Sequence, residues 1–159
     1  MTGKLALVAA AACTAGFVVG AGPAASARTA TCRPTQSLGG GPFETSGASF
    51  PKRSRIGRGH VLTGRVLRFP GCAPIKGAVV DFWQESPNGA YDRRGQASVV
   101  TDRAGTFRFE GPRPPAEGGR PSHIHIRVSA GGYVDFVTTY FLRPGEKNGR
   151  IVIVLVSGL

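Results

Sequence analysis

Residues 97–110 read ASVVTDRAGTFRFE, and this stretch decides the fold class. Two short runs, at 97–101 and 106–110, are rich in β-branched and aromatic residues, which favour strands. The segment between them, 102–105, contains the aspartate and the glycine that suit a type I turn. The stretch therefore predicts two strands separated by a tight turn.

The same alternation of strand-forming runs and turns recurs along the chain. Glycine and proline are 36 of the 159 residues (24 Gly and 12 Pro), too many for a helical bundle because both are costly inside helices. No segment carries helix start and stop signals. We expect an all-β protein, a single β-sandwich of about seven to eight short strands. The strands are predicted at residues 61–69, 79–85, 97–101, 106–110, 123–129, 134–142 and 151–156.

Residues 1–27 are predicted to be a secretory signal peptide. Lys4 is their only charge, an apolar run covers residues 5–20, and ASA at 25–27 matches an A-x-A cleavage site. The alternative, a membrane anchor, is disfavoured because a run of about sixteen residues is short for a bilayer span of about 20. Removing 27 of the 159 residues leaves 132, and the loss of Lys4 lowers the net charge from +11 to +10. We expect a secreted, extracellular protein without stable membrane insertion.

Two cysteines, Cys32 and Cys72, remain after the signal peptide. In an oxidising compartment an even pair predicts a disulfide, here closing a loop of about 40 residues. A metal-ligand role is disfavoured because neither cysteine lies in a C-x-x-C spacing. Residues 28–58, rich in Gly, Pro, Ser, Thr and basic residues, are predicted to be an N-terminal arm or linker. The sandwich domain itself would occupy residues 59–159.

Residues 120–128 read RPSHIHIRV and carry the clearest chemical signal. In a strand, His123 and His125 share one face about 6.5 to 7 Å apart, while the isoleucines project from the other face. Two adjacent imidazoles suit one metal ion. The alternative is a pair of solvent-facing histidines. The third histidine, His60, ends the basic arm and is predicted to lie on the surface.

The chain resembles the intradiol ring-cleavage dioxygenases, non-haem ferric enzymes that open catechols between their two hydroxyls. Besides the two histidines, the resemblance rests on GPF at 41–43, PIKGAVVDFWQ at 74–84, NGAY at 88–91 and TDRAGTFRF at 101–109. Tyr91 matches the first tyrosinate ligand of the family, and His123 and His125 match its two histidine ligands. Arg120 matches an arginine that stabilises charge on the bound substrate. The resemblance implies an Fe(III) site, with Tyr91 and Arg120 as catalytic residues.

The chemistry of these residue types suits that cofactor. Ferric iron is a hard ion that prefers a phenolate to a thiolate, and its charge lowers the pKa of a coordinating tyrosine. Two imidazoles and one phenolate leave positions at which a catechol can bind through both oxygens. In the family the bound ring is attacked by O2, and Arg120 would offset its negative charge. The implied function is intradiol cleavage of a catecholic aromatic compound with O2.

The sequence departs from the family at two places. The second tyrosinate ligand of the family is expected within residues 111–119, but this segment, GPRPPAEGG, contains no tyrosine. Glu117 lies near the expected position, so it is either a substitute metal ligand or a solvated glutamate. Thr138 stands about where the family usually has a glutamine. Tyr133 and Tyr140 match strand positions, not ligands.

Two functional hypotheses follow. The first is a secreted, dioxygenase-like iron protein that cleaves a catechol, with a small aromatic substrate and O2 as its partners. The second is a non-catalytic β-sandwich of the same fold that binds a catechol, a polyanion or a metal, including zinc or copper at the histidine pair. The charge of +10 favours attraction to anions. Nucleic acid is disfavoured because the basic residues are scattered and export is predicted. A homodimer is an open alternative to a monomer.

Overall fold

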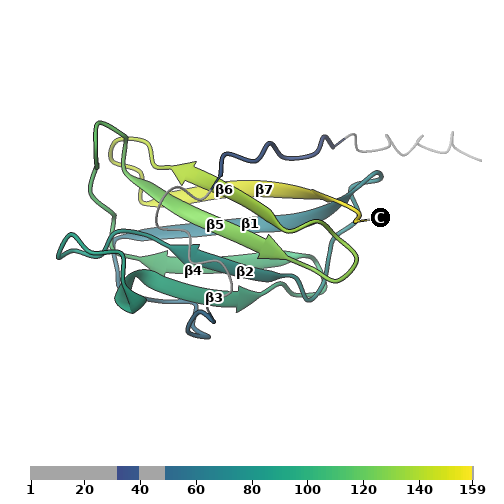
Figure 1. The fold of residues 1–159 in the computed structure, drawn as a ribbon, viewed down its shortest axis with the longest axis horizontal. Helices are drawn as coiled ribbons and strands as arrows, with labels where there is room; N and C mark the ends of the chain where they lie inside the picture. Colours follow the sequence, from purple (N-terminus) through teal and green to yellow (C-terminus); the bar gives the residue numbers. More distant parts are fainter. Residues whose placement is uncertain (1–31, 40–48, 159) are drawn as a thin grey trace, which may run out of the picture.

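The computed structural model describes residues 32–39 and 49–158 and shows a two-layered β-sandwich (Figure 1). All seven predicted strands are confirmed, with ends that differ by at most three residues. Within the described residues, helical structure is limited to the 3-10 turn Arg93–Gly95, which the Asp92 side chain caps by accepting from Arg94 N. The strands are β1 (His60–Phe69), β2 (Val79–Trp83), β3 (Gln96–Val100), β4 (Thr106–Gly111), β5 (His123–Ser129), β6 (Phe136–Phe141) and β7 (Asn148–Val156).

The strands form one sheet of three, in the order β4-β1-β7, and one of four, in the order β3-β2-β5-β6. β1 pairs antiparallel with β4 and parallel with β7, and every pair in the four-stranded sheet is antiparallel. The turn at 102–105 therefore carries the chain from one sheet to the other. Gly105 has a φ of +71°, and a Cβ there would lie 2.5 Å from the Val66 carbonyl oxygen. This turn requires glycine.

The core lies between the inner faces of the two sheets. Phe82 of β2 stacks on Phe109 of β4 with ring centroids 4.6 Å apart. Because side chains alternate along a strand and the isoleucines of β5 point inward, His123 and His125 lie on the outer face of the four-stranded sheet. Aliphatic side chains without exposed surface surround the stacked pair, among them Leu62, Val66, Val80, Ile124, Ile126, Val128 and Ile153.

The N-terminal segments cover the outer edges of both sheets. Residues 32–39 run along β7 and β6, where Thr35 N donates to the Val154 carbonyl at 3.1 Å (Figure 1). Residues 51–56 bond to β3 and β4 on the other side. Unpaired strand edges invite pairing with other chains. These segments remove that hazard by occupying the edges.

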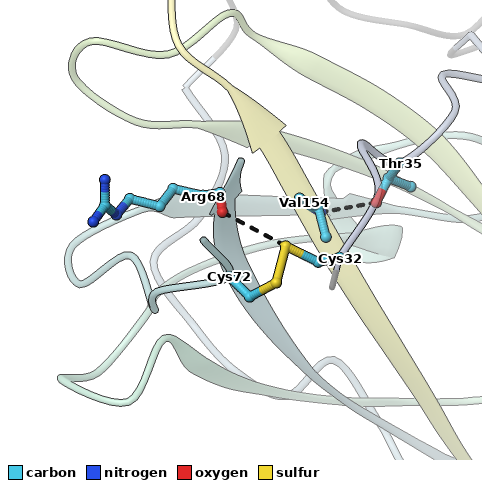
Figure 2. Close-up of a disulfide and its surroundings, with 5 residues drawn as sticks. All are labelled: Cys32, Thr35, Arg68, Cys72 and Val154. Carbon is cyan, nitrogen blue, oxygen red and sulfur yellow. Dashed lines mark hydrogen bonds between the residues drawn. A yellow bond between two sulfur atoms is a disulfide. The ribbon is translucent and has the colours of Figure 1, made fainter. Parts of the chain in front are cut away.

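A disulfide joins Cys32 to Cys72, as the sequence predicts, across a separation of 40 residues (Figure 2). Cys72 follows the end of β1, and Figure 2 shows the bond between Thr35 and Val154 of β7 beside it. The cross-link and this bond hold the same segment against the same sheet. A closed loop of this length lowers the entropy of the unfolded chain.

Other predictions stay untested by the fold. The predicted signal peptide at 1–27 and the GPF motif at 41–43 lie outside the described residues. Within the part of the chain that the structure describes, no helix is long and apolar enough to cross a membrane. The division into signal peptide, arm and domain therefore stays a prediction, as does a homodimer.

Candidate active site

His123 and His125 lie side by side on β5. Their ring centroids are 4.9 Å apart, and the rings are nearly perpendicular at 88°. Each residue is only 2% exposed, so the alternative of a solvent-facing pair is wrong. Two buried imidazoles on an outer sheet face mean that other parts of the chain cover this face. The pair is therefore part of an enclosed site.

Each imidazole is oriented through its Nδ1 atom. His123 Nδ1 lies 2.8 Å from the Pro121 carbonyl oxygen, so Nδ1 donates to this oxygen. His125 Nδ1 lies 3.2 Å from Thr139 Oγ1. Metal-binding histidines commonly use one ring nitrogen in this way and coordinate through the other. These contacts are compatible with metal coordination through the other ring nitrogen of each histidine.

Trp83 holds the second imidazole from one side. The register between β2 and β5 places Trp83 opposite His125, and their rings stack at 5.1 Å and 16°. Phe50 packs edge-on against Trp83 at 5.9 Å. The sequence analysis did not single out Trp83 as a site residue. Strand alternation was the available signal, because Phe82 points inward and its neighbour must point outward.

Tyr91 reaches the histidines from the loop between β2 and β3. A tight turn shapes this loop, in which Ser86 N donates to the Ala90 carbonyl at 2.9 Å. Tyr91 Oη lies 3.5 Å from His123 Nε2, and the rings of Tyr91 and His125 are 6.0 Å apart. Residues from a loop and a strand, distant in sequence, therefore meet as the resemblance implies.

Glu117 lies against the same tyrosine. Gly118 and Gly119 have positive φ values of +54° and +77°, as a two-residue turn of type I′ requires. Backbone bonds of 3.1 and 2.7 Å between Glu117 and Arg120 close the turn. Tyr91 Oη donates to Glu117 Oε2 at 2.8 Å. The turn thus directs the Glu117 carboxylate into the cluster.

Burial and neighbouring charges set the protonation of the cluster. Burial raises the pKa of Tyr91 above 10. The hydrogen bond to Glu117 and the charges of Glu117 and Glu85 raise it further, while the charge of Arg120 opposes them. Burial, with nearby positive charge, lowers the pKa of His125 to about 4. At neutral pH and without a cation, Tyr91 is a neutral phenol and His125 a neutral imidazole.

Arg120 lies at the rim of the cluster. Its guanidinium carbon is 5.9 Å from the centroid of Phe141, whose ring is 5.8 Å from that of His123. Glu85, which the sequence analysis missed, has a buried Oε2 atom without a hydrogen-bond partner in the described structure. Nothing in its sequence position signals this, because the loop path brings it near Tyr91. The cluster therefore has positive charge at its rim and a second carboxylate nearby.

The cluster fits a hard metal ion. Tyr91, Glu117, His123 and His125 offer a phenol oxygen, a carboxylate and two imidazoles, and hard oxygen donors with imidazole suit Fe(III). Tyr91 Oη is the meeting point, at 2.8 Å from the carboxylate and 3.5 Å from an imidazole nitrogen. Among the described residues, no three His, Cys, Asp or Glu side chains form a metal cluster by themselves. A metal ion at this place would therefore need the tyrosine as one of its ligands.

His60 requires a correction. It was predicted to lie on the surface, and this is wrong, because only 1% of it is exposed. β1 begins at this residue, and its side chain points inward. His60 Nε2 lies 3.4 Å from Glu146 Oε1, which also accepts from Tyr140 Oη. A second cluster of ionisable residues therefore lies inside the sandwich.

Thr138 and Tyr133 lie away from the histidine pair. Thr138 pairs with Ile126 and is buried on the inner face of β6, whereas Thr139 faces the site. Tyr133 lies before β6 in an isolated bridge to Ser157 and packs against the core. That Tyr133 is not a ligand stays a prediction.

Comparisons with known proteins place this geometry in context. No family model matches the chain. It is 31% identical over 134 residues to a hydroxyquinol 1,2-dioxygenase from a Rhizobium species, covering 64% of this chain and 45% of that protein. It is 29% identical over 142 residues to a 6-chlorohydroxyquinol 1,2-dioxygenase from Cupriavidus pinatubonensis, covering 67% of this chain and 50% of that protein. The chain spans about half the length of these relatives.

Solved structures give the same answer for the fold. The dioxygenase domain of a carbohydrate-binding fusion protein from Streptomyces sp. SirexAA-E superimposes with a TM-score of 0.68 at 24% identity, over 79% of this chain and all of that domain. An intradiol ring-cleavage dioxygenase from Tetranychus urticae gives 0.62 at 29% identity, over 69% and 65% of the two chains. By sequence and by fold together, the chain is similar to the intradiol ring-cleavage dioxygenases.

Proposed function

We propose that this chain is an intradiol-type dioxygenase that cleaves a catecholic aromatic compound with O2 at an Fe(III) centre. Tyr91, His123 and His125 hold the iron, and Glu117 takes the place of the missing second tyrosine. The observation that carries the proposal is the position of Tyr91 Oη, 2.8 Å from Glu117 Oε2 and 3.5 Å from His123 Nε2.

The negative charges of Glu117 and Glu85 next to Tyr91 favour a cation at this place. A buried phenol next to two carboxylates does not ionise at neutral pH unless positive charge compensates. A bound ferric ion supplies that charge and polarises the catechol oxygens. His125, neutral because burial lowers its pKa to about 4, keeps its lone pair available over the whole neutral range.

Glu117 has two tasks in this proposal. Its carboxylate carries the same single negative charge as a tyrosinate, so it preserves the charge balance that favours Fe(III). It already accepts the Tyr91 proton as a hydrogen bond, so it is also placed to receive a proton from a substrate hydroxyl. Arg120 at the rim offsets negative charge on the bound ring.

The proposal includes secretion. The predicted signal peptide at 1–27 directs export, and a disulfide between Cys32 and Cys72 persists in an oxidising compartment. A catechol-cleaving enzyme in that location meets aromatic compounds outside the cell.

A second candidate is a non-catalytic protein of the same fold that binds metal or catechol. One observation favours it: residues 111–119 contain no tyrosine. In this case the cluster binds iron, but O2 is not consumed.

Iron loading of the purified, disulfide-bonded chain tests the proposal. We expect visible absorption from a tyrosinate bound to Fe(III), lost in Tyr91→Phe and kept in the matched control Tyr133→Phe. With catechol, we expect O2 uptake and a ring-opened dicarboxylate product. Absence of colour in the native protein contradicts the iron site. Colour without O2 uptake supports the second candidate instead.

A further inference from the structure

Three arginines surround Thr63 on the outward face of the three-stranded sheet. The registers pair Thr63 with Arg108 of β4 on one side and with Arg150 of β7 on the other. Neighbouring strands are about 4.8 Å apart, so these two backbones are about 10 Å apart across the face. Arg65 lies two residues along β1 and points the same way. All three arginines are exposed.

Positive charge exceeds negative charge on this face. Glu110 pairs with both Arg55 and Arg108, at 2.8 and 2.9 Å, so its charge is more than balanced. Asp102 lies in the turn that leads into β4. Among the described residues of the face, four arginines therefore meet two carboxylates.

Two hollows lie among these side chains and share Thr63 as a wall. Exposed aliphatic side chains border them, and Val152 is 54% exposed. A guanidinium can bind a carboxylate through two parallel hydrogen bonds, a threonine hydroxyl can bond to a sugar hydroxyl, and valine can contact the apolar face of a sugar ring. One hollow, of about 300 Å³, is lined by Thr63, Arg65, Thr106, Arg150 and Val152, and the other, of about 400 Å³, by Thr63, Val100, Asp102, Thr106 and Arg108.

We propose that this face binds a linear acidic polysaccharide. Within residues 32–39 and 49–158, no further layer of strands covers this three-stranded surface, and its charge complements carboxylated sugars. Single-stranded nucleic acid usually binds through stacked aromatic side chains. On the described outward positions of β1, β4 and β7 the aromatic side chain is Phe69, at the far end of β1. A second copy of the chain would bring like charges together, which disfavours self-association through this face.

The proposed surface is independent of the iron site. The histidine pair lies on the outer face of the other sheet, and the core separates the two faces. Polysaccharide binding would hold the protein at an anionic surface while the opposite layer remains accessible to small molecules. The two proposals can therefore fail separately.

Binding of the full, disulfide-bonded chain to immobilised polygalacturonate tests the proposal. We expect binding that weakens as salt is raised, since charge drives it. The triple variant Arg65→Gln, Arg108→Gln, Arg150→Gln should bind at least tenfold more weakly. A control that loses the same charge elsewhere, Lys76→Gln, Arg93→Gln, Arg143→Gln, should change affinity less than twofold.

Thermal melting and the iron absorption of both triple variants show whether each is folded. Equal loss in the two variants means that net charge alone drives binding, which overturns the proposal. Binding to neutral dextran with similar affinity overturns it too. Tighter binding to single-stranded DNA or to phosphatidylserine vesicles also overturns it, because either result would identify a different class of partner.

Discussion

The sandwich contains two clusters built from the same three residue types. The site cluster is Tyr91, Glu117 and His123, and the inner cluster is Tyr140, Glu146 and His60. In both, the tyrosine hydroxyl donates to the glutamate. In the site cluster the histidine approaches the tyrosine, with Nε2 at 3.5 Å from Oη. In the inner cluster it approaches the glutamate, with Nε2 at 3.4 Å from Oε1.

The difference shows that residue types alone do not make a metal site. His123 is anchored through Nδ1 to the Pro121 carbonyl, and a second imidazole lies 4.9 Å away. His60 uses Nε2 for Glu146, and its buried Nδ1 atom has no hydrogen-bond partner in the described structure. In the site cluster, His123 Nε2 is therefore placed to bind a metal ion. The inner cluster is a structural contact between β1 and the end of the sandwich.

Removing the second imidazole of the candidate metal site and, separately, the imidazole of the inner cluster tests this contrast most strongly. His125→Ala should weaken Fe(III) binding by at least about a hundredfold. Mutating residues that only orient metal ligands lowers metal affinity about 10- to 100-fold, and this variant removes a proposed ligand itself. His60→Ala should leave iron affinity within about twofold while lowering stability through the cavity it creates. Iron titration followed by visible absorption measures both. Equal iron affinity in His125→Ala and the native protein would falsify the contrast.

Changing the two glutamates sharpens the comparison. Glu117→Ala should weaken Fe(III) binding about 10- to 100-fold and reduce O2 uptake. Glu117→Tyr restores the ligand type of the family and should recover iron binding with a more intense visible band. Glu146→Gln is the matched control and should leave the band unchanged. If Glu117→Ala binds iron as the native chain does, Glu117 is not a ligand.

The inner glutamate should matter for stability instead. Glu146→Gln weakens bonds from both Tyr140 and His60, and a hydrogen bond to a charged group contributes about 1.5 to 3 kcal/mol. We expect a loss of about 2 kcal/mol in the free energy of unfolding, measured by urea denaturation of the oxidised protein. Glu117→Gln, whose side chain is partly exposed, should lose less. A larger loss in Glu117→Gln would reverse the assigned roles.

Acid should destabilise the iron-free protein through two buried histidines, His60 and His125. Burial lowers the pKa values of His60 and His125 below 6.5, so the unfolded chain binds more protons once the pH falls below 6.5. Stability therefore decreases as pH falls, and for His125 the window runs from 6.5 to about 4. His60→Gln removes one of these groups and should show a shallower decrease. An unchanged slope in that variant would mean that His60 does not titrate as its burial implies.

Local sequence determines much of this architecture and part of the site. Alternation and turn chemistry located seven strands, and the H-x-H spacing placed two imidazoles on one face. The order of the strands in the sheets could not be predicted from local sequence. Residues 97–110 have the pattern of a hairpin, but their two strands belong to different sheets. His60 was misplaced because a charged neighbourhood in sequence says nothing about the direction of the first strand residue. Glu85 and Trp83 joined the site through loop path and register, which are tertiary properties.

Tyr140→Phe gives the smallest expected effect and the matched control for the central claim that Tyr91 binds iron. Removing the hydrogen bond to Glu146 should cost about 1.5 kcal/mol of stability, the low end for a bond to a charged group. Resonance Raman spectra of the iron-loaded native, Tyr91→Phe and Tyr140→Phe proteins test that claim most directly. The account predicts Fe(III)-tyrosinate modes in the native and Tyr140→Phe proteins and none in Tyr91→Phe. Modes that persist in Tyr91→Phe, or that disappear only in Tyr140→Phe, would contradict it.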